Sequence, residues 1–145
     1  MLSQFISPAH LPWTLTVIAV MAVTIWRGGP EERLAANSLL IGWLLTKLVY
    51  RYQGGQTEWG ILAVDVGLLA VLLWIALRST RYWPMFAASF HLLAVVTHIA
   101  KTADPTVGGW AYITAAIIWS YLLAFAIGYG AWTAPMNAPA GATRR

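Results

Sequence analysis

Apolar residues in this chain fall into five long runs that are separated by short polar breaks. Each run holds roughly 20 residues, the length of an α-helix that crosses a hydrocarbon core about 30 Å thick. Turn-forming residues mark the breaks, most clearly the glycine pairs at 28–29, 54–55 and 108–109. The pattern predicts an all-α integral membrane bundle whose five transmembrane helices cover about residues 8–26, 31–52, 57–77, 83–101 and 108–132.

The sequence also predicts the nature of the first apolar run and of the C-terminal tail. No Lys or Arg precedes Arg27, and no small-residue cleavage pattern follows the first run, so we interpret it as a retained span and not as a secretory signal. Gly128 and Gly130, near the end of the last run, either admit a close neighbour or loosen the helix. We expect a single transmembrane domain over residues 1–132 and a disordered cytoplasmic tail over residues 133–145, which are rich in Ala and Pro.

Composition supports a membrane location. Hydrophobic residues make up 59% of the 145 residues and charged residues only 10%, whereas soluble domains carry about 25% charged residues. The lipid bilayer is therefore the expected partner. The net charge of +4 comes from residues at span ends and in loops, which indicates membrane topology and not nucleic-acid binding. The absence of cysteine excludes disulfides, thiol catalysis and thiolate metal sites.

Basic residues divide unequally between the two sides of the predicted bundle. The side with the excess of Lys and Arg normally faces the cytoplasm. We therefore expect the N-terminus outside and the C-terminus in the cytoplasm. The cytoplasmic side would carry Arg27, Arg33, Arg78, Arg81, Arg144 and Arg145, and the outer side Lys47, Arg51 and Lys101.

Four residues form a candidate buried polar cluster inside the predicted spans: Lys47, Asp65, His91 and His98. At a rise of about 1.5 Å per residue, all four fall in the outer half of the membrane. His91 and His98 are seven residues apart, which places them on one helix face with Ala87 and Ala94. Ionisable side chains in a span usually face the protein interior. We expect Asp65 to accept a hydrogen bond from Lys47, from a histidine, or from both.

Two interpretations of this cluster stay open. In the structural one, an ion pair or an Asp–His hydrogen bond fixes the register of helices whose apolar faces otherwise resemble lipid. In the functional one, a histidine with a pKa of about 6.5 beside a carboxylate carries a proton or senses periplasmic pH. Glu58, seven residues before Asp65, and Lys101 are possible accessory groups. Glu58 could equally be a solvated charge at the start of its helix.

Haem b is a third possibility, because histidines in a span can ligate iron axially. Ligation by two histidines needs one on a facing helix, and the remaining histidine, His10, could reach His98 but not His91. We therefore expect no cofactor unless a partner subunit supplies a ligand. The seven-residue spacing also separates the imidazoles too far for one metal ion. The sequence has no P-loop, G-x-G-x-x-G, G-x-S-x-G or H-E-x-x-H motif, so no catalytic residue is predicted.

The segment RYWPMFAASFHLLAVVTHIAK, followed by DPTVGGWAYITAAIIWSY, resembles a group of small multi-pass inner-membrane proteins of proteobacteria that carry no assigned function. The resemblance covers about the last 65 residues. It implies a bacterial cytoplasmic (inner) membrane and transfers no catalytic residue.

Taken together, these patterns favour a structural or accessory subunit of a membrane assembly, because the soluble segments are too short to hold a separate active site. The expected partners are other membrane subunits or further copies of the chain. One alternative is a small proton-linked carrier or pH sensor that uses Asp65, His91 and His98. Another is a haem- or quinone-binding redox subunit.

Overall fold

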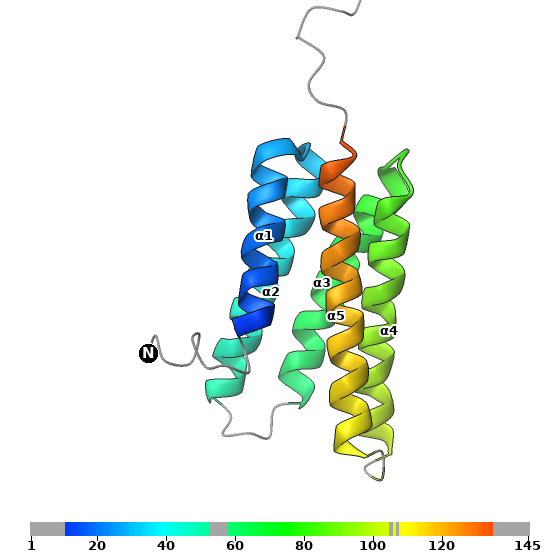
Figure 1. Ribbon diagram of the computed structural model, residues 1–145. Coiled ribbons are helices and arrows are strands. Elements are labelled where there is room, and N and C mark those ends of the chain that lie inside the picture. The colour runs from blue at the N-terminus through cyan, green and yellow to red at the C-terminus, as the bar shows by residue number, and fades with distance from the viewer. Residues whose placement is uncertain (1–10, 53–57, 105, 107, 135–145) are drawn as a thin grey trace, which may run out of the picture.

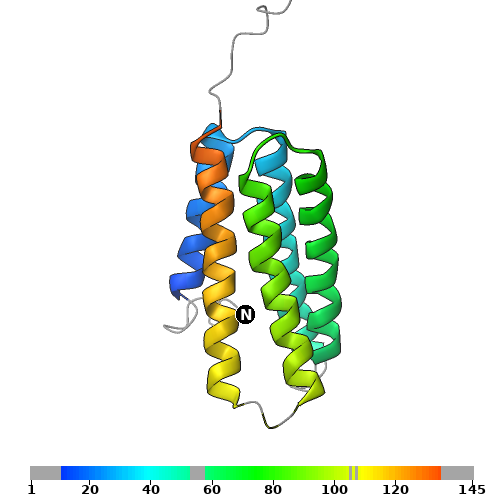
Figure 2. The ribbon, with the colours of Figure 1, turned by 90° about the vertical axis from the view of Figure 1, so that its right-hand side faces the viewer.

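The computed structural model describes residues 11–52, 58–104, 106 and 108–134. In this part of the chain five helices follow one another: α1 (Leu11–Arg27), α2 (Pro30–Tyr52), α3 (Glu58–Arg78), α4 (Trp83–Ala103) and α5 (Gly109–Trp132). They lie side by side and alternate in direction (Figures 1 and 2). Each helix contacts the next along the chain and α1 contacts α5, so the five close into a ring.

Three of the helices are long and apolar enough to cross a membrane, judged by length and composition alone. These are α3 from Trp59 onward, α4 and α5. The apolar helix α1 is shorter, at 17 residues. Helix α2 has 23 residues and begins with the acidic pair Glu31 and Glu32. The all-α prediction is therefore confirmed for the described residues, and membrane-spanning character holds for three helices.

Most helix ends lie within a residue of their predicted positions, but α4 is longer than predicted. The sequence pattern placed a loop from Lys101 onward, whereas α4 continues to Ala103. Its last turn is completed by the Asp104 N–H, which donates to the Ala100 carbonyl at 2.9 Å. Asp104 itself is extended (φ −130°, ψ 98°), as expected for a residue that precedes a proline. Predicted helical residues 8–10 and 57 lie outside the described residues.

The predicted tail begins too early. Thr133 and Ala134 pack against the end of α5, where the Thr133 N–H donates to the Tyr129 carbonyl at 3.0 Å and Ala134 is buried. The polar bonds available to Thr133 hold it there, which composition alone did not indicate. Residues 135–145, the rest of the predicted tail, lie outside the described part of the chain.

Small residues line the interior of the ring. On α2 the buried positions are Glu32, Ala35, Ala36, Leu39 and Gly42, which is the i, i+3, i+4, i+7 stripe of a helix with one inward face, continued at i+10. Alanines also fill the buried face of α4, where they let neighbouring backbones approach closely. Larger side chains close the remaining space at the centre: Leu72, Ile75, Leu123 and Ile127.

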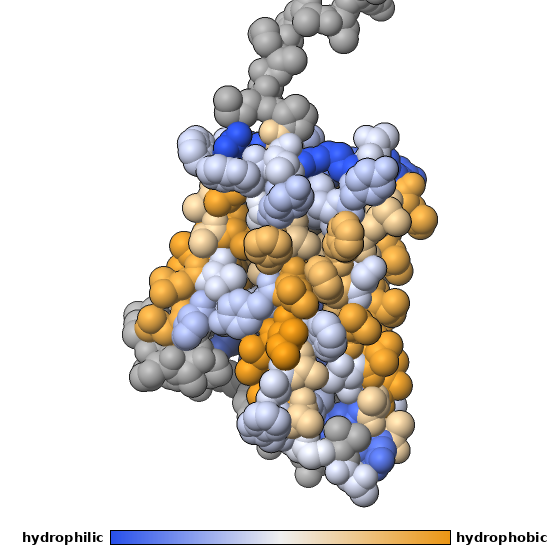
Figure 3. Space-filling view, turned by 45° about the vertical axis from the view of Figure 1, so that its right-hand side comes forward, coloured by the Kyte–Doolittle hydropathy of each residue, from blue (hydrophilic) through white to orange (hydrophobic). Residues whose placement is uncertain are grey.

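The outside of the bundle is largely apolar. Large hydrophobic side chains are exposed on every helix, and Figure 3 shows them over the flank of the molecule, below a hydrophilic end. That hydrophilic end is where α1, α3 and α5 finish and where α2 and α4 begin (Figure 1). We call it the arginine end, after Arg27, Arg33, Arg78 and Arg81.

Candidate functional site

A carboxylate on α3 faces two imidazoles on α4 near the opposite end of the bundle. The Asp65 Oδ2 atom lies 3.0 Å from His98 Nε2, and its Oδ1 atom lies 4.0 Å from His91 Nε2. The His91 Nε2 atom also lies 3.0 Å from the Asp65 backbone carbonyl. All three side chains are shielded, with exposed fractions of 17% for Asp65, 12% for His98 and 7% for His91.

The helix face that carries the histidines explains this burial. Ala87 and Ala94 lie on the same face of α4 as His91, and all three are buried. A stripe of small residues allows α3 and α5 to come close enough for a histidine to reach across to Asp65. The predicted sharing of one inward face by these α4 residues is therefore what the structure has.

A tyrosine on α5 completes the site. The Tyr112 hydroxyl lies 2.8 Å from His98 Nδ1, and the two rings meet edge to face with centroids 5.4 Å apart. Tyr112 was not among the residues predicted for the site. The contact between His98 and Tyr112 could have been predicted, because α4 and α5 form a hairpin and residues at similar distances from its loop face each other. We call Asp65, His91, His98 and Tyr112 the histidine–aspartate site.

The partners of the two imidazoles assign their tautomers. A carbonyl oxygen only accepts hydrogen bonds, so His91 Nε2 carries a hydrogen and donates it to the Asp65 carbonyl. Beside an ionised Asp65 carboxylate, His98 Nε2 carries a hydrogen as well. The neutral His98 ring then accepts at Nδ1 from the Tyr112 hydroxyl. Both ring nitrogens of His98 are thus matched, donor to acceptor, with Asp65 on one side and Tyr112 on the other.

The resulting order of groups is hydroxyl, imidazole, carboxylate. An imidazole between a hydroxyl and a carboxylate can take the hydroxyl proton while the carboxylate stabilises the cation that forms. The chain runs from α5 through α4 to α3, so proton movement along it would alter contacts between three helices. The arrangement can therefore hold or relay a proton, or fix the register of these helices.

The other predicted site residues lie on α2, α3 and α4. The Lys47 ammonium, on α2, is 5.5 Å from the centroid of the Trp43 ring one turn earlier. Lys101 lies in the last turn of α4, one turn beyond His98. Glu58 is the first residue of α3, and its side chain lies outside the described part of the structure.

The histidine–aspartate site does not have the form of a metal centre. Within the described ranges, no group of three or more His, Asp or Glu side chains is arranged to hold a metal ion. Both ring nitrogens of His98 have protein partners, so haem iron could bind this ring only by displacing Asp65 or Tyr112. His10, the third histidine of the haem b hypothesis, lies outside the described residues.

A second buried polar group lies at the arginine end, and the sequence argument missed it. Glu32 is 2% exposed and forms a salt bridge with the Arg81 guanidinium from the loop between α3 and α4. Arg81 Nη2 also donates to the Gly130 carbonyl and to the Thr133 hydroxyl, each at 2.8 Å. The other Glu32 oxygen accepts from the Gly29 N–H at 2.9 Å. This pair therefore joins the start of α2, the α3–α4 loop and the end of α5.

The local part of this second polar group could have been predicted from the sequence. Gly29, Pro30 and Glu32 stand at the positions of a helix cap, a first-turn proline and the third-residue carboxylate that bonds back to the cap. The salt bridge to Arg81, 49 residues away, had no such local pattern.

Comparison with protein-family models, with curated proteins and with solved structures finds no match to this chain.

Proposed function

We propose that all five helices cross the inner membrane of a bacterium, with the N-terminus outside and the C-terminus in the cytoplasm. The apolar exterior supports this, because soluble proteins rarely expose such continuous apolar surface. Helix α1, with its 17 residues, meets the lower limit of about 17–25 residues for a span. The four arginines of the arginine end support its position on the cytoplasmic side.

Within this membrane frame, we propose that the protein is a small proton-linked carrier or pH sensor that works through the histidine–aspartate site. One observation carries the proposal: His98 bridges the Asp65 carboxylate and the Tyr112 hydroxyl. His98 is five residues from the end of α4, so the site is about 8 Å from the outer end of that helix, within reach of protons from outside.

Protonation of His98 would change both of its contacts. A proton added at Nδ1 reverses the hydrogen bond to Tyr112: the ring then donates, and the hydroxyl must accept and turn its own hydrogen elsewhere. The same proton strengthens the attraction between the imidazolium and Asp65, so the link between α3 and α4 is kept. Two arrangements of α5 against α4 would follow, and external pH would set their populations.

The test uses full-length protein in lipid vesicles. Histidine protonation is followed by NMR over about pH 5 to 8, the range in which imidazoles usually titrate, and proton flux is followed with an entrapped pH-sensitive dye. We expect wild-type protein to respond to pH and Asp65→Asn to lose the response while it keeps its melting temperature. Asp104→Asn, an exposed carboxyl at the same end, serves as the matched control and should respond like wild type.

Flux in these vesicles would identify a carrier, and a pH-dependent structural change without flux would identify a sensor. The proposal is wrong if wild-type protein shows neither, or if Asp65→Asn responds as wild type does.

A second candidate function, an accessory subunit of a membrane assembly, is favoured by a different surface. A groove of about 440 Å³ lies between α2 and α3. Its lining includes Ser38 and Gly42 on α2 and Ala63 and Gly67 on α3, each pair spaced four residues apart. Small residues at this spacing are typical of contacts between transmembrane helices, and nothing lies within 4 Å of where a Gly67 side chain would begin.

Purification from native membranes tests this candidate. We expect a defined partner to co-purify with wild-type protein and to be lost from Gly67→Leu, which fills the groove. Gly128→Leu, on the other side of the bundle, should keep the partner. Purification of wild-type protein as a lone monomer would contradict the accessory role.

A further inference from the structure

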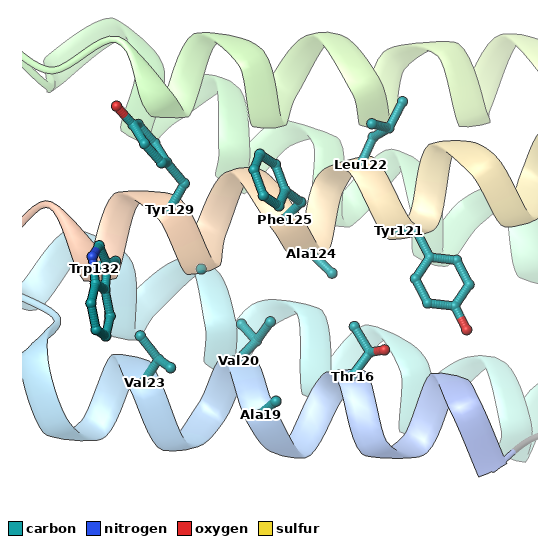
Figure 4. A pocket seen from close by; sticks show the side chains of 11 residues that line it. Thr16, Ala19, Val20, Val23, Tyr121, Leu122, Ala124, Phe125, Tyr129 and Trp132 are labelled. Atoms are coloured by element: carbon teal, nitrogen blue, oxygen red, sulfur yellow. The ribbon is translucent and has the colours of Figure 1, made fainter.

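A long apolar groove runs between α1 and α5. It has a volume of about 740 Å³ and is lined almost entirely by carbon, from Thr16, Ala19, Val20 and Val23 on α1 and from Tyr121 to Trp132 on α5 (Figure 4). Phe125, Tyr129 and Trp132 are more than half exposed on its rim, so the groove opens to the outside of the bundle.

The length of the groove matches half of a bilayer. Tyr121 and Trp132 mark its two ends on α5, and the intervening helix rises about 16 Å. One leaflet of a hydrocarbon core about 30 Å thick has a depth of about 15 Å. At the Tyr121 end an aromatic pair borders the groove, because the Trp13 and Tyr121 rings meet edge to face with centroids 5.3 Å apart. The groove is therefore bounded at the depth where an acyl chain from one leaflet ends.

The other end of the groove carries a cation. The Arg27 guanidinium lies 4.5 Å from the centroid of Trp132 and 5.8 Å from that of Trp26. Its Nε atom is buried and has no hydrogen-bond partner among the described residues. The acidic side chains described at this end are bonded elsewhere, Glu32 to Arg81 and Glu31 to the Ser79 hydroxyl at 2.6 Å.

From this combination we propose that the groove binds an anionic phospholipid. One acyl chain lies between α1 and α5, and the headgroup phosphate accepts hydrogen bonds from the Arg27 guanidinium. An apolar slot of leaflet depth with a guanidinium at its interfacial end matches the two parts of such a lipid, its chain and its phosphate. The proposal rests on the proposed membrane location but not on the histidine–aspartate site.

The experiment uses full-length protein in vesicles of phosphatidylcholine with a minor share of phosphatidylglycerol. Lipid retained by the protein is measured by native mass spectrometry, and immobilised chains by electron paramagnetic resonance of spin-labelled phosphatidylglycerol. We expect Arg27→Gln to lower the preference for phosphatidylglycerol about fivefold, the loss expected for one basic residue beside anionic lipid. Arg27→Lys should keep most of the preference.

Two further variants distinguish lipid binding in the groove from general attraction of anionic lipid to surface charge. Arg78→Gln removes a matched arginine that lies 4.6 Å from the Trp74 ring but does not line the groove, and it should leave the preference unchanged. Ala19→Phe fills the groove and keeps Arg27, and it should remove the immobilised chain.

Equal losses from Arg27→Gln and Arg78→Gln would overturn the proposal, since anionic lipid would then gather at the arginine end without a site. Unchanged lipid retention by Ala19→Phe would overturn it as well. So would a second copy of the chain, or a partner helix, cross-linked through Ala19→Cys in place of lipid. Flotation of the vesicles reports insertion separately, so a protein that fails to enter the membrane contradicts the proposed location and is told apart from loss of the lipid site.

Discussion

At Gly130 the indole of Trp83 occupies the space that a side chain would need. A β-carbon built on Gly130 would lie 2.5–2.8 Å from three atoms of that ring, and Trp83 is itself buried. Of the two roles considered for the glycines near the end of α5, Gly130 has the first: it admits a close neighbour. Gly128 is different, because its nearest atom, on Val20, lies at an ordinary contact distance of 3.8 Å.

These distances predict opposite effects for two alanine substitutions. Gly130→Ala should lower the free energy of unfolding by about 1–3 kcal/mol, the usual cost of overpacking. Gly128→Ala should leave it unchanged or raise it by up to about 1 kcal/mol, because alanine favours the helix. Unfolding in mild detergent, followed by circular dichroism, measures both. Equal stability of the two variants would mean that the Trp83 ring can shift.

The helix ends depend on polar bonds that hydrophobic pattern does not report. At the end of α4, one Asp104 oxygen accepts from the Thr106 hydroxyl at 2.6 Å and from the Thr106 N–H at 2.9 Å. Around the arginine end, the Glu32–Arg81 pair ties α2, the α3–α4 loop and α5 together. Both sets of polar bonds hold residues in place beyond the apolar part of a helix. Each set can be tested by substitution at a helix end.

The hydrogen bonds from Thr106 lower the pKa of Asp104 below its ordinary value of 3.8. Thr106→Ala removes the hydroxyl, which is the larger cause, and should raise the pKa of Asp104 toward that value. Because the folded-state pKa is lowered, the stabilisation is present above the unfolded value and is lost as the pH falls through the lowered value. Carboxyl carbon shifts in an NMR titration measure the change. Thr102→Ala, whose hydroxyl bonds the His98 carbonyl, is the control and should leave the pKa of Asp104 unchanged.

Removing only one partner of the buried Glu32–Arg81 pair should lower the stability of the protein substantially. Glu32→Gln is expected to destabilise the protein by about 3 kcal/mol, the low end for removal of one partner of a buried ion pair, because Arg81 keeps a 27% exposed side chain. The neighbouring Glu31→Gln should cost only about 1 kcal/mol, since it weakens one hydrogen bond.

Thermal unfolding of both variants, and of Glu32→Gln combined with Arg81→Met, measures the coupling. The double variant should lose less than the sum of the single losses. Additive losses would indicate that the two side chains act independently.

The whole molecule has two unlike ends. The arginine end is held by an ion pair and by contacts between arginines and aromatic rings. The opposite end carries the histidine–aspartate site, where a carboxylate, two imidazoles and a hydroxyl join the helices. In the proposed function, the response to pH begins at this end.

This arrangement predicts which end faces which side of the membrane. The chain has no cysteine, so single cysteines can be placed at will. Ala103→Cys, exposed at the end of α4, should react with a membrane-impermeant maleimide in intact cells. Thr80→Cys, exposed between α3 and α4, should react only after permeabilisation. The reverse pattern would invert the proposed topology, and reaction of both in intact cells would contradict the proposed set of five spans.

The sequence by itself determined the helices and the positions of the polar residues along them. Apolar runs of span length form helices in lipid because no other structure satisfies their backbone groups locally, and a fixed rise per residue sets where Asp65, His91 and His98 lie along them. The shared face of the α4 alanines and His91 followed from the same periodicity.

Only the tertiary structure decided which of these residues meet. The pairing of His98 with Tyr112, the bridge from Glu32 to Arg81 and the contact of Trp83 with Gly130 each depend on how two helices are rotated about their own axes and how far apart they pack. Periodicity along one helix determines which side chains share a face. Packing of all five helices determines which neighbouring helix that face contacts.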